Sequence, residues 1–326
     1  MSIKILKPGI LATLVADERK GFRSIGVGPG GAMDNFAMTA GNYLLGNSER
    51  EASIEFWFPA IEILFQRGLV ACFTGKGFEL RIDDVPLPLW KPIEIREGST
   101  IKLVKSSSGA CVYLAVRSGW KAQNWLGSFG THLGVKAGGY KGRSLQINDI
   151  VETNFSETEV GETKALPWGI SDHELRKVYS PSSEIRITPC IETELLTSLS
   201  TDRLLSDSFV INSQSNRMGY RLNGLPLSLS RPMELISSPV DYGTIQLLPD
   251  GNLIILMADH QTTGGYPRIA SVIKADLPKL AQIMPGEKIN FKMVSLPEAE
   301  TELCSRANQL AELKTGCQLR FNDYFK

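Results

Sequence analysis

The chain has 326 residues, of which 42% are hydrophobic and 21% charged, and its 35 basic residues balance its 35 acidic residues. This composition is typical of a globular protein with a sizeable core, and the length favours two domains. A zero net charge without any basic run argues against nucleic-acid binding. Because the N-terminus does not resemble a signal peptide and no apolar stretch reaches about 18 residues, we expect a cytoplasmic protein with no membrane partner.

Cysteine and histidine usage argues against a metal site. The five cysteines are scattered without a Cys-x-x-Cys pair, and the chain has only three histidines. Zinc sites usually combine these two residue types at short, regular spacings. We therefore expect reduced thiols and no bound metal.

The first half predicts short strands and one helix. Asp34 is placed to cap a helix from Asn35 to Leu45, with apolar residues spaced for one face. The loop before it, Gly26–Gly31, fits the dinucleotide-binding pattern G-x-G-x-x-G, but Pro29 lies inside the turn and no βαβ unit follows. We favour a flexible or ligand-contacting loop. Short runs after the helix predict strands at 61–65, 69–73, 79–82, 100–104 and 111–116.

The second half repeats this pattern. Strands are predicted at 184–187, 244–248, 253–257 and 288–291, and Asp276 is placed to cap a helix over 277–283. Ser295 and Glu298 form a capping-box pattern for a C-terminal helix. Its leucines are spaced to form one stripe that packs on the protein's own core: Leu296, Leu303, Leu310 and Leu313.

These elements predict a mainly β fold with few short helices, built as antiparallel barrels or sandwiches. The two halves also share the order and approximate spacing of their strands, which indicates two related domains. We place the N-terminal domain at 1–155 and the C-terminal domain, with the C-terminal helix, at 156–326.

The segment Asp259–Ala270 is the strongest candidate for a functional site. It follows an apolar strand and brings polar side chains, two threonines and the pair Gly264 and Gly265 into one turn. Glycine pairs let a ligand or a second backbone come close. The alternative is an ordinary tight turn whose polar groups bind their own backbone.

Three charged or titratable residues could do chemistry around this turn. His260 could act as a general acid or base, although a histidine in a turn is more often a surface or hydrogen-bonding residue. Arg217 and Arg221 could hold carboxylates or phosphates, or equally tie loops together by ion pairs. Thr74-Gly75-Lys76 fails as a phosphate-binding loop, because Val70 occupies the position of its first glycine.

The signature Asp259–Ala270, its continuation to Gln282 and other blocks over about residues 20 to 292 resemble one family. It is the family of the 5-oxoprolinase C subunit, also known as KipA, allophanate hydrolase subunit 2 or the biotin-dependent carboxyltransferase domain. The resemblance implies two cyclophilin-like β-barrel domains. A few positions of the first half depart from the family pattern, whereas the second-half signature is intact; the departures are Gly30, 56–58, Phe129 and Asn148.

The resemblance implies one component of a hydrolase that opens 5-oxo-L-proline to L-glutamate with ATP, in a hetero-oligomer with the KipI-like B subunit and the A subunit of 5-oxoprolinase. ATP, expected as Mg-ATP, could be held by the complex and not by this chain alone. One alternative is a urea- or allophanate-type biotin-dependent carboxyltransferase component, although no biotin is expected on this chain. Another is a KipA-like regulator that binds a KipI-like partner without catalysis.

The expected site combines these observations. We expect catalytic roles for Asp259, His260 and Asp34. The expected substrate-binding residues are Arg217, Arg221, Gln261, Thr262, Thr263, Gly264, Gly265 and Tyr266.

Overall fold

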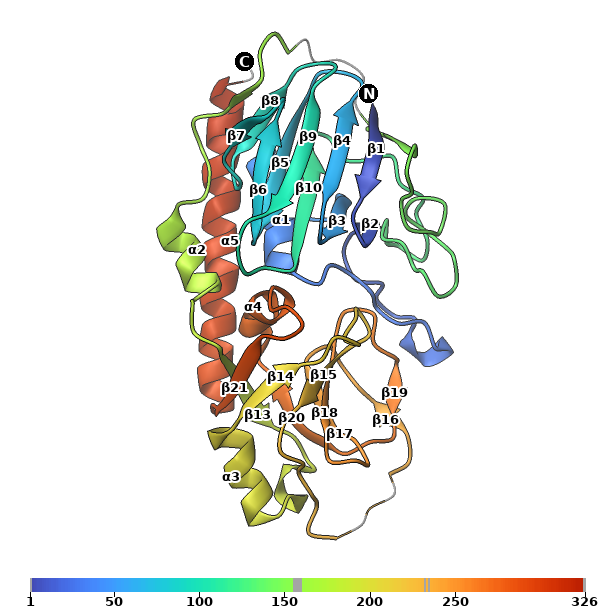
Figure 1. Cartoon of the computed structure of the whole chain (residues 1–326), viewed down its shortest axis with the longest axis vertical. Coiled ribbons are helices and arrows are strands. Elements are labelled where there is room, and N and C mark those ends of the chain that lie inside the picture. Colours follow the sequence, from blue (N-terminus) through green and yellow to red (C-terminus); the bar gives the residue numbers. More distant parts are fainter. Residues whose placement is uncertain (1, 155–159, 232, 234, 325–326) are drawn as a thin grey trace. The chain divides into compact units, whose positions relative to one another are not determined.

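The computed structural model describes residues 2–154, 160–231, 233 and 235–324 (Figure 1). The expected domain boundary at 155/156 lies outside these residues. The chain forms two compact units that are discontinuous in sequence. Unit 1 takes residues from 1–19, 34–175 and 308–326, and unit 2 takes residues from 20–33 and 176–307. Three segments therefore belong to the unit that the expected boundary would not assign them to: 20–33, 160–175 and 308–324.

Unit 1 contains two six-stranded antiparallel sheets. Their strand orders are β11-β1-β4-β9-β6-β7 and β12-β8-β5-β10-β3-β2. Side chains from both sheets share one apolar core, among them Ile63 and Phe65 of the first sheet and Phe56 and Phe73 of the second. The strands are β1 (Ser2–Pro8), β2 (Leu11–Val15), β3 (Ser53–Trp57), β4 (Ile61–Phe65), β5 (Leu69–Gly75), β6 (Phe78–Ile82), β7 (Val85–Leu87), β8 (Pro92–Ile95), β9 (Thr100–Lys105), β10 (Cys111–Val116), β11 (Ile150–Glu152) and β12 (Lys164–Ala165).

The central strands β5 and β10 are buried along their whole length. Helix α1 (Asn35–Leu44) packs on both of them, which explains why neither shows the alternation of a half-exposed strand. The helix approaches closely at Gly41, where an added Cβ would lie 3.1 Å from the Thr74 hydroxyl oxygen. That hydroxyl donates a hydrogen bond to the carbonyl of Ala37 at 2.7 Å.

Unit 2 contains a closed seven-stranded barrel in the order β13-β20-β17-β18-β15-β14-β21. Parallel pairing of β13 with β21 closes the ring, and the other neighbours are antiparallel. This barrel confirms the mainly β prediction. Its strands are β13 (Glu184–Pro189), β14 (Ser208–Ile211), β15 (Gly219–Asn223), β17 (Thr244–Leu247), β18 (Leu253–Leu256), β20 (Arg268–Val272) and β21 (Lys288–Met293); a separate pair joins β16 (Ser238–Pro239) to β19 (Thr263–Gly264).

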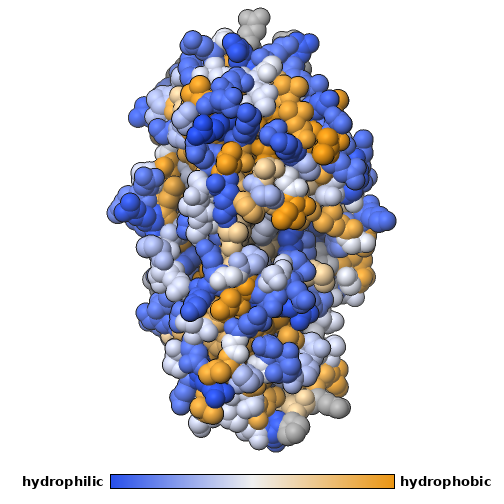
Figure 2. Space-filling view, viewed as in Figure 1, coloured by the Kyte–Doolittle hydropathy of each residue, from blue (hydrophilic) through white to orange (hydrophobic). Residues whose placement is uncertain are grey.

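The remaining helices are mostly short, as predicted, with one exception. They are α2 (Asp172–Val178), α3 (Ser198–Ser206), α4 (Leu277–Ala281) and α5 (Leu296–Tyr324), with 3-10 turns η1 (Arg23–Ile25), η2 (Thr193–Leu195) and η3 (Lys274–Asp276). Helix α5 has 29 residues. No helix in the described part of the chain is long and apolar enough to cross a membrane. On the face drawn in Figure 2, hydrophobic residues form small patches among hydrophilic ones.

Helix α5 begins with the predicted capping box, since Ser295 N donates to Glu298 Oε2 at 2.7 Å. The predicted leucine stripe is wrong for its first turns, because Leu296 is 65% and Leu303 43% exposed. Farther along, Leu313 packs on a second apolar cluster of unit 1. In the part of α5 that belongs to unit 2, Glu302 and Arg306 make polar contacts with the rest of that unit.

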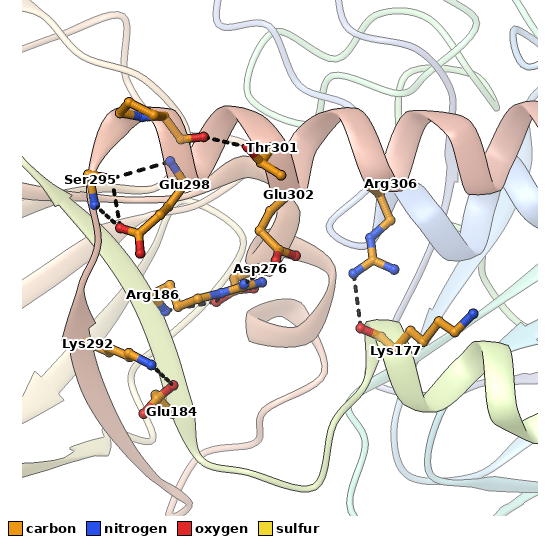
Figure 3. Close-up of polar contacts among 11 residues, drawn as sticks. Lys177, Glu184, Arg186, Asp276, Lys292, Ser295, Glu298, Thr301, Glu302 and Arg306 are labelled. Carbon is orange, nitrogen blue, oxygen red and sulfur yellow. Dashed lines mark hydrogen bonds and ion pairs between the residues drawn. The ribbon is translucent and has the colours of Figure 1, made fainter.

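Figure 3 shows these polar contacts. Arg186 lies between two carboxylates, with Nη2 2.6 Å from Asp276 Oδ1 and Nη1 3.2 Å from Glu302 Oε1 on α5. Asp276 makes no side-chain cap for α4, contrary to the prediction. Its carboxylate binds the backbone N–H and guanidinium of Arg186 instead, which satisfies a side chain that is only 7% exposed.

Candidate functional site

The signature turn is fixed by an ion pair between two of the predicted site residues. Asp259 N donates to the carbonyl of Arg217 at 2.8 Å, which brings the two residues side by side after β18. The Arg217 guanidinium then donates from Nε to Asp259 Oδ2 at 2.7 Å and from Nη2 to Oδ1 at 3.0 Å. This bidentate geometry matches the planar guanidinium to the carboxylate. Arg217 is thus engaged as a loop tie, one of its two predicted roles.

The glycine loop that precedes α1 packs against this turn within unit 2. We name residues Lys20–Met33 the strap. Arg217 Nη2 donates to the carbonyl of Gly31 at 2.6 Å, and Tyr242 Oη donates to the carbonyl of Met33 at 2.8 Å. An added Cβ at Gly28 would lie 3.0 Å from the carbonyl oxygen of His260. The strap therefore contacts the signature segment through backbone atoms, which fits its glycine content.

The strap does not form a dinucleotide site. Its glycine loop, Gly26–Gly31, is preceded by the 3-10 turn η1, whereas the dinucleotide fingerprint needs a parallel strand there. At its exposed end, Arg23 Nη2 lies 2.8 Å from Asp241 Oδ1. Burial raises the pKa of Asp241, but the hydrogen bonds from Arg23 and from Tyr242 N–H, together with the charges of Arg23 and His260, hold it below the usual range.

His260 is buried, with 1% of its surface exposed. The sequence placed it on a polar turn outside the core, and that expectation is wrong. Its Nδ1 lies 2.6 Å from the carbonyl oxygen of Gln261. A carbonyl can only accept, so Nδ1 carries the proton in this contact. The ring therefore supports the backbone of the next residue from below the surface.

A pocket of about 570 Å³ lies on the barrel of unit 2. Three predicted residues line it, Arg221, Gln261 and Tyr266. The sequence reasoning missed four polar lining residues: Gln214, Asn216, Gln246 and Asp250. Asn216 adjoins Arg217 and Asp250 opens an Asp-Gly turn, but no local pattern links these positions to one another.

Four other predicted residues shape the site through the backbone. Thr263 and Gly264 form β19, which pairs with β16, and the carbonyl of Thr262 accepts a hydrogen bond from Val240 N at 3.2 Å. An added Cβ at Gly264 would lie 2.4 Å from Gln246 Nε2. At Gly265 the nearest atoms would be 3.4 Å away. Gly264 is thus required for the close approach to Gln246, and Gly265 is not.

Asp34 belongs to unit 1 and is fully buried. Its Oδ1 accepts from Ala37 N at 2.9 Å, which is the predicted helix cap. Its own N–H donates to Tyr113 Oη at 2.7 Å, and that hydroxyl donates to the buried Glu55 at 2.7 Å. Burial raises the pKa of Tyr113, so the phenol stays protonated. These contacts give Asp34 a structural role at the start of α1.

The described residues contain no group of three or more His, Cys, Asp or Glu side chains that could hold a metal ion. A phosphate-binding loop is also missing at Thr74 and Gly75, because these residues form the end of β5.

The chain matches a known protein family. The family model described as carboxyltransferase domain, subdomain A and B, matches residues 25–293. The chain belongs to this carboxyltransferase domain family. The match includes most of the strap, the pocket and the whole signature segment.

Two relatives named as the C subunit of 5-oxoprolinase align over nearly the whole chain. The 5-oxoprolinase C subunit of Haemophilus influenzae is 38% identical, covering 91% of this chain and 93% of the relative. The 5-oxoprolinase C subunit of Escherichia coli is 34% identical, with the same coverage. Among solved structures, the urea carboxylase of Kluyveromyces lactis superposes with a TM-score of 0.87 at 24% identity, covering 97% of this chain and 29% of that one. The similarity to the urea carboxylase structure shows that the two chains share a fold.

Proposed function

We propose that this chain is the C subunit of an ATP-dependent 5-oxoprolinase, which hydrolyses the lactam of 5-oxo-L-proline to L-glutamate. The observation that carries the proposal is similarity, over nearly the full length of both chains, to two proteins named as the C subunit of 5-oxoprolinase. A match to only part of such a protein would be weaker support for this proposal. In this proposal the chain works in a cytoplasmic hetero-oligomer with the KipI-like B subunit and the A subunit.

The geometry of unit 2 suits this chemistry. Opening a lactam places negative charge on its oxygen, and phosphorylation of that oxygen by ATP would make the carbon easier to attack. Asp259 keeps 30% of its side chain exposed while Arg217 fixes its orientation. In this proposal Asp259 presents the carboxylate of the turn to solvent, and His260 holds the nearby backbone at Gln261.

ATP binding is assigned to the assembled complex in this proposal. Thr74 and Gly75 lie at the end of β5 and not in a loop. The Thr74 hydroxyl donates its hydrogen bond to the carbonyl of Ala37. The chain would then supply substrate contacts, and its partners would complete the nucleotide site.

Reconstitution tests the proposal. The purified chain is mixed with the candidate A and B subunits, ATP and 5-oxoproline, and glutamate release is followed while each component is omitted in turn. We expect glutamate only from the complete mixture. A well-folded, co-purifying complex that releases no glutamate would contradict the proposal.

A second candidate is carboxyl transfer, because the family that the chain belongs to is described as a carboxyltransferase domain. Such a component would need a biotin carboxylase and a biotinylated carrier from other chains. Transfer of labelled carboxyl from carboxybiotin to urea, dependent on this chain, would favour this candidate. Its absence alongside glutamate release would exclude it as the main activity.

A further inference from the structure

The pocket of unit 2 lies on the outer face of the barrel, across three neighbouring strands. Gln246 of β17 pairs with Ile254 of β18, and Ile254 pairs with Arg221 of β15. Residues paired in this way stand in a row on one face of the sheet. The residues that flank Ile254, Leu253 and Ile255, are at most 1% exposed and fill the barrel core, so the row faces outward.

Arg221 supplies positive charge to this row. Within the described parts of the chain, its guanidinium makes no hydrogen bond or ion pair. Its charge helps to lower the pKa of Asp250, but the hydrogen bonds from Asn252 come first among the causes. The other arginine in this row, Arg268, pairs with Gln246 in the strand register but is held by Glu192 at 2.7 Å. Arg221 is therefore available to an anionic ligand, whereas Arg268 is not.

Gln246 supplies an amide that its own protein satisfies poorly. The side chain belongs to a residue only 1% exposed, yet among the described residues its only hydrogen bond runs from Nε2 to the carbonyl of Tyr266 at 3.5 Å. Ordinary N–H to O bonds have lengths of about 2.7 to 3.2 Å. A buried amide without good partners is costly, so a ligand that bonds to it gains free energy.

The rest of the wall combines further amides with apolar surface. Gln214, Asn216 and Gln261 add carboxamides at the pocket wall, and Asp250 adds a carboxylate. The apolar lining consists of Met218, Leu248, Pro249 and Ile254. Gly219 keeps this wall open, because an added Cβ there would lie 2.7 Å from Ile254 Cδ1. Volumes of about 300 to 1,000 Å³ are usual for small-molecule sites, and this pocket falls within that range.

We propose that this pocket binds a small carboxylate that also carries an amide, with the carboxylate on Arg221, the amide on Gln246 and the methylenes against the apolar wall. Building on the proposed function, the ligand is 5-oxoproline, which has one carboxylate, one lactam and a short hydrocarbon ring. Ring opening creates the ammonium group of glutamate, and Asp250 is the carboxylate of the pocket lining that would pair with it.

Ligand-observed NMR titration of the chain tests the pocket without the other subunits. Three probes separate its features: 5-oxoproline, proline, which lacks the lactam carbonyl, and 2-pyrrolidone, which lacks the carboxylate. We expect 5-oxoproline to bind at least about tenfold more tightly than either fragment, a difference of about 1.4 kcal/mol. Arg221→Ala and Gln246→Ala should each weaken it about tenfold. Arg231→Ala, which removes an exposed arginine outside the pocket lining, should leave it unchanged.

The assembled complex gives the second measurement. Arg221→Ala should raise the KM for 5-oxoproline about tenfold. Glutamate release with an unchanged KM would overturn the pocket and leave the proposed function intact. Arg221-dependent binding of 5-oxoproline in a complex that releases no glutamate would support the pocket and contradict the proposed function. No binding to the chain, or equal binding of proline, would overturn the pocket.

Discussion

Arg217 and Asp259 form a bidentate ion pair, with Nε 2.7 Å from Oδ2 and Nη2 3.0 Å from Oδ1. The same guanidinium also holds the carbonyl of Gly31 in the strap. One side chain thus joins the signature turn to a segment that lies far away in sequence. Because Arg217 is 8% exposed, the pair is shielded from water on its arginine side.

Removing one partner of this pair should destabilise unit 2. Arg217→Ala leaves a partly exposed carboxylate and the carbonyl of Gly31 without their partner, which should cost about 1 to 3 kcal/mol. Denaturant unfolding of Arg217→Ala, Asp259→Ala and the double variant measures the coupling. We expect the double variant to lose much less unfolding free energy than the sum of the losses in the two single variants. Additive losses would show that the pair contributes nothing as a pair.

The strap gives this prediction a second readout. Its exposed residues include Lys20, where trypsin can cut. Arg217→Ala should speed this cleavage, because the strap loses its contact at Gly31. Asp241→Ala breaks the Arg23–Asp241 pair, whose side chains are 38% and 58% exposed, and leaves the tryptic sites of the strap in place. Such exposed pairs contribute little, so cleavage should change less. The reverse order would contradict the role of Arg217 in holding the strap.

His260→Ala should affect both stability and catalysis. The variant leaves a cavity and removes the partner of the Gln261 carbonyl, which should cost about 1 to 3 kcal/mol. If His260 positions Gln261, the KM for 5-oxoproline should rise more than kcat falls, and His260→Asn should restore part of it. His173→Ala, at an exposed position of α2, serves as the control. A fall in kcat alone, at unchanged stability, would instead point to direct proton transfer by His260.

The two glycines of the signature turn should respond differently to the same methyl group. Gly264→Ala pushes against Gln246 Nε2, which would lie 2.4 Å away, and should weaken 5-oxoproline binding about tenfold. Gly265→Ala meets nothing closer than 3.4 Å and should bind normally. Thermal melts should show both variants folded, because the methyl group added at position 264 meets the end of the Gln246 side chain, which can move. Equal affinity of the two variants would contradict the assignment of Gln246 to the ligand.

Cys317 predicts a stability change at alkaline pH. Burial raises the pKa of its thiol from 9.0 to about 11. The folded chain therefore keeps this proton where the unfolded chain loses it, and the thiol's contribution to stability is present below about pH 9 and is lost towards pH 11. The stability difference between wild type and Cys317→Ala should shrink over this window. Cys304→Ala, at an exposed site, should show no such trend, and a constant difference for Cys317→Ala would exclude the effect.

Much of the local structure could be predicted because it depends on neighbours in sequence. Asp34 caps α1 and Ser295 starts α5, since each cap joins residues about three positions apart. Strands with alternating burial, such as β4, are visible as a period of two. The predictions were wrong where a side chain binds a partner that is distant in sequence. Asp276 fits a cap pattern, but Arg186 offers its carboxylate a stronger, charged partner.

Local patterns in the chain predicted the mainly β class, the starts of α1 and α5, and a candidate site at Asp259, Arg217, Arg221, Gln261 and Tyr266. The three-dimensional fold was needed to divide these residues between an ion pair and a pocket. It also buried His260, placed the strap on unit 2 and brought Gln246 and Arg221 into one row with Ile254. The physical reason is strand register: a shift of one residue turns every side chain to the opposite face, and that register is set by barrel closure.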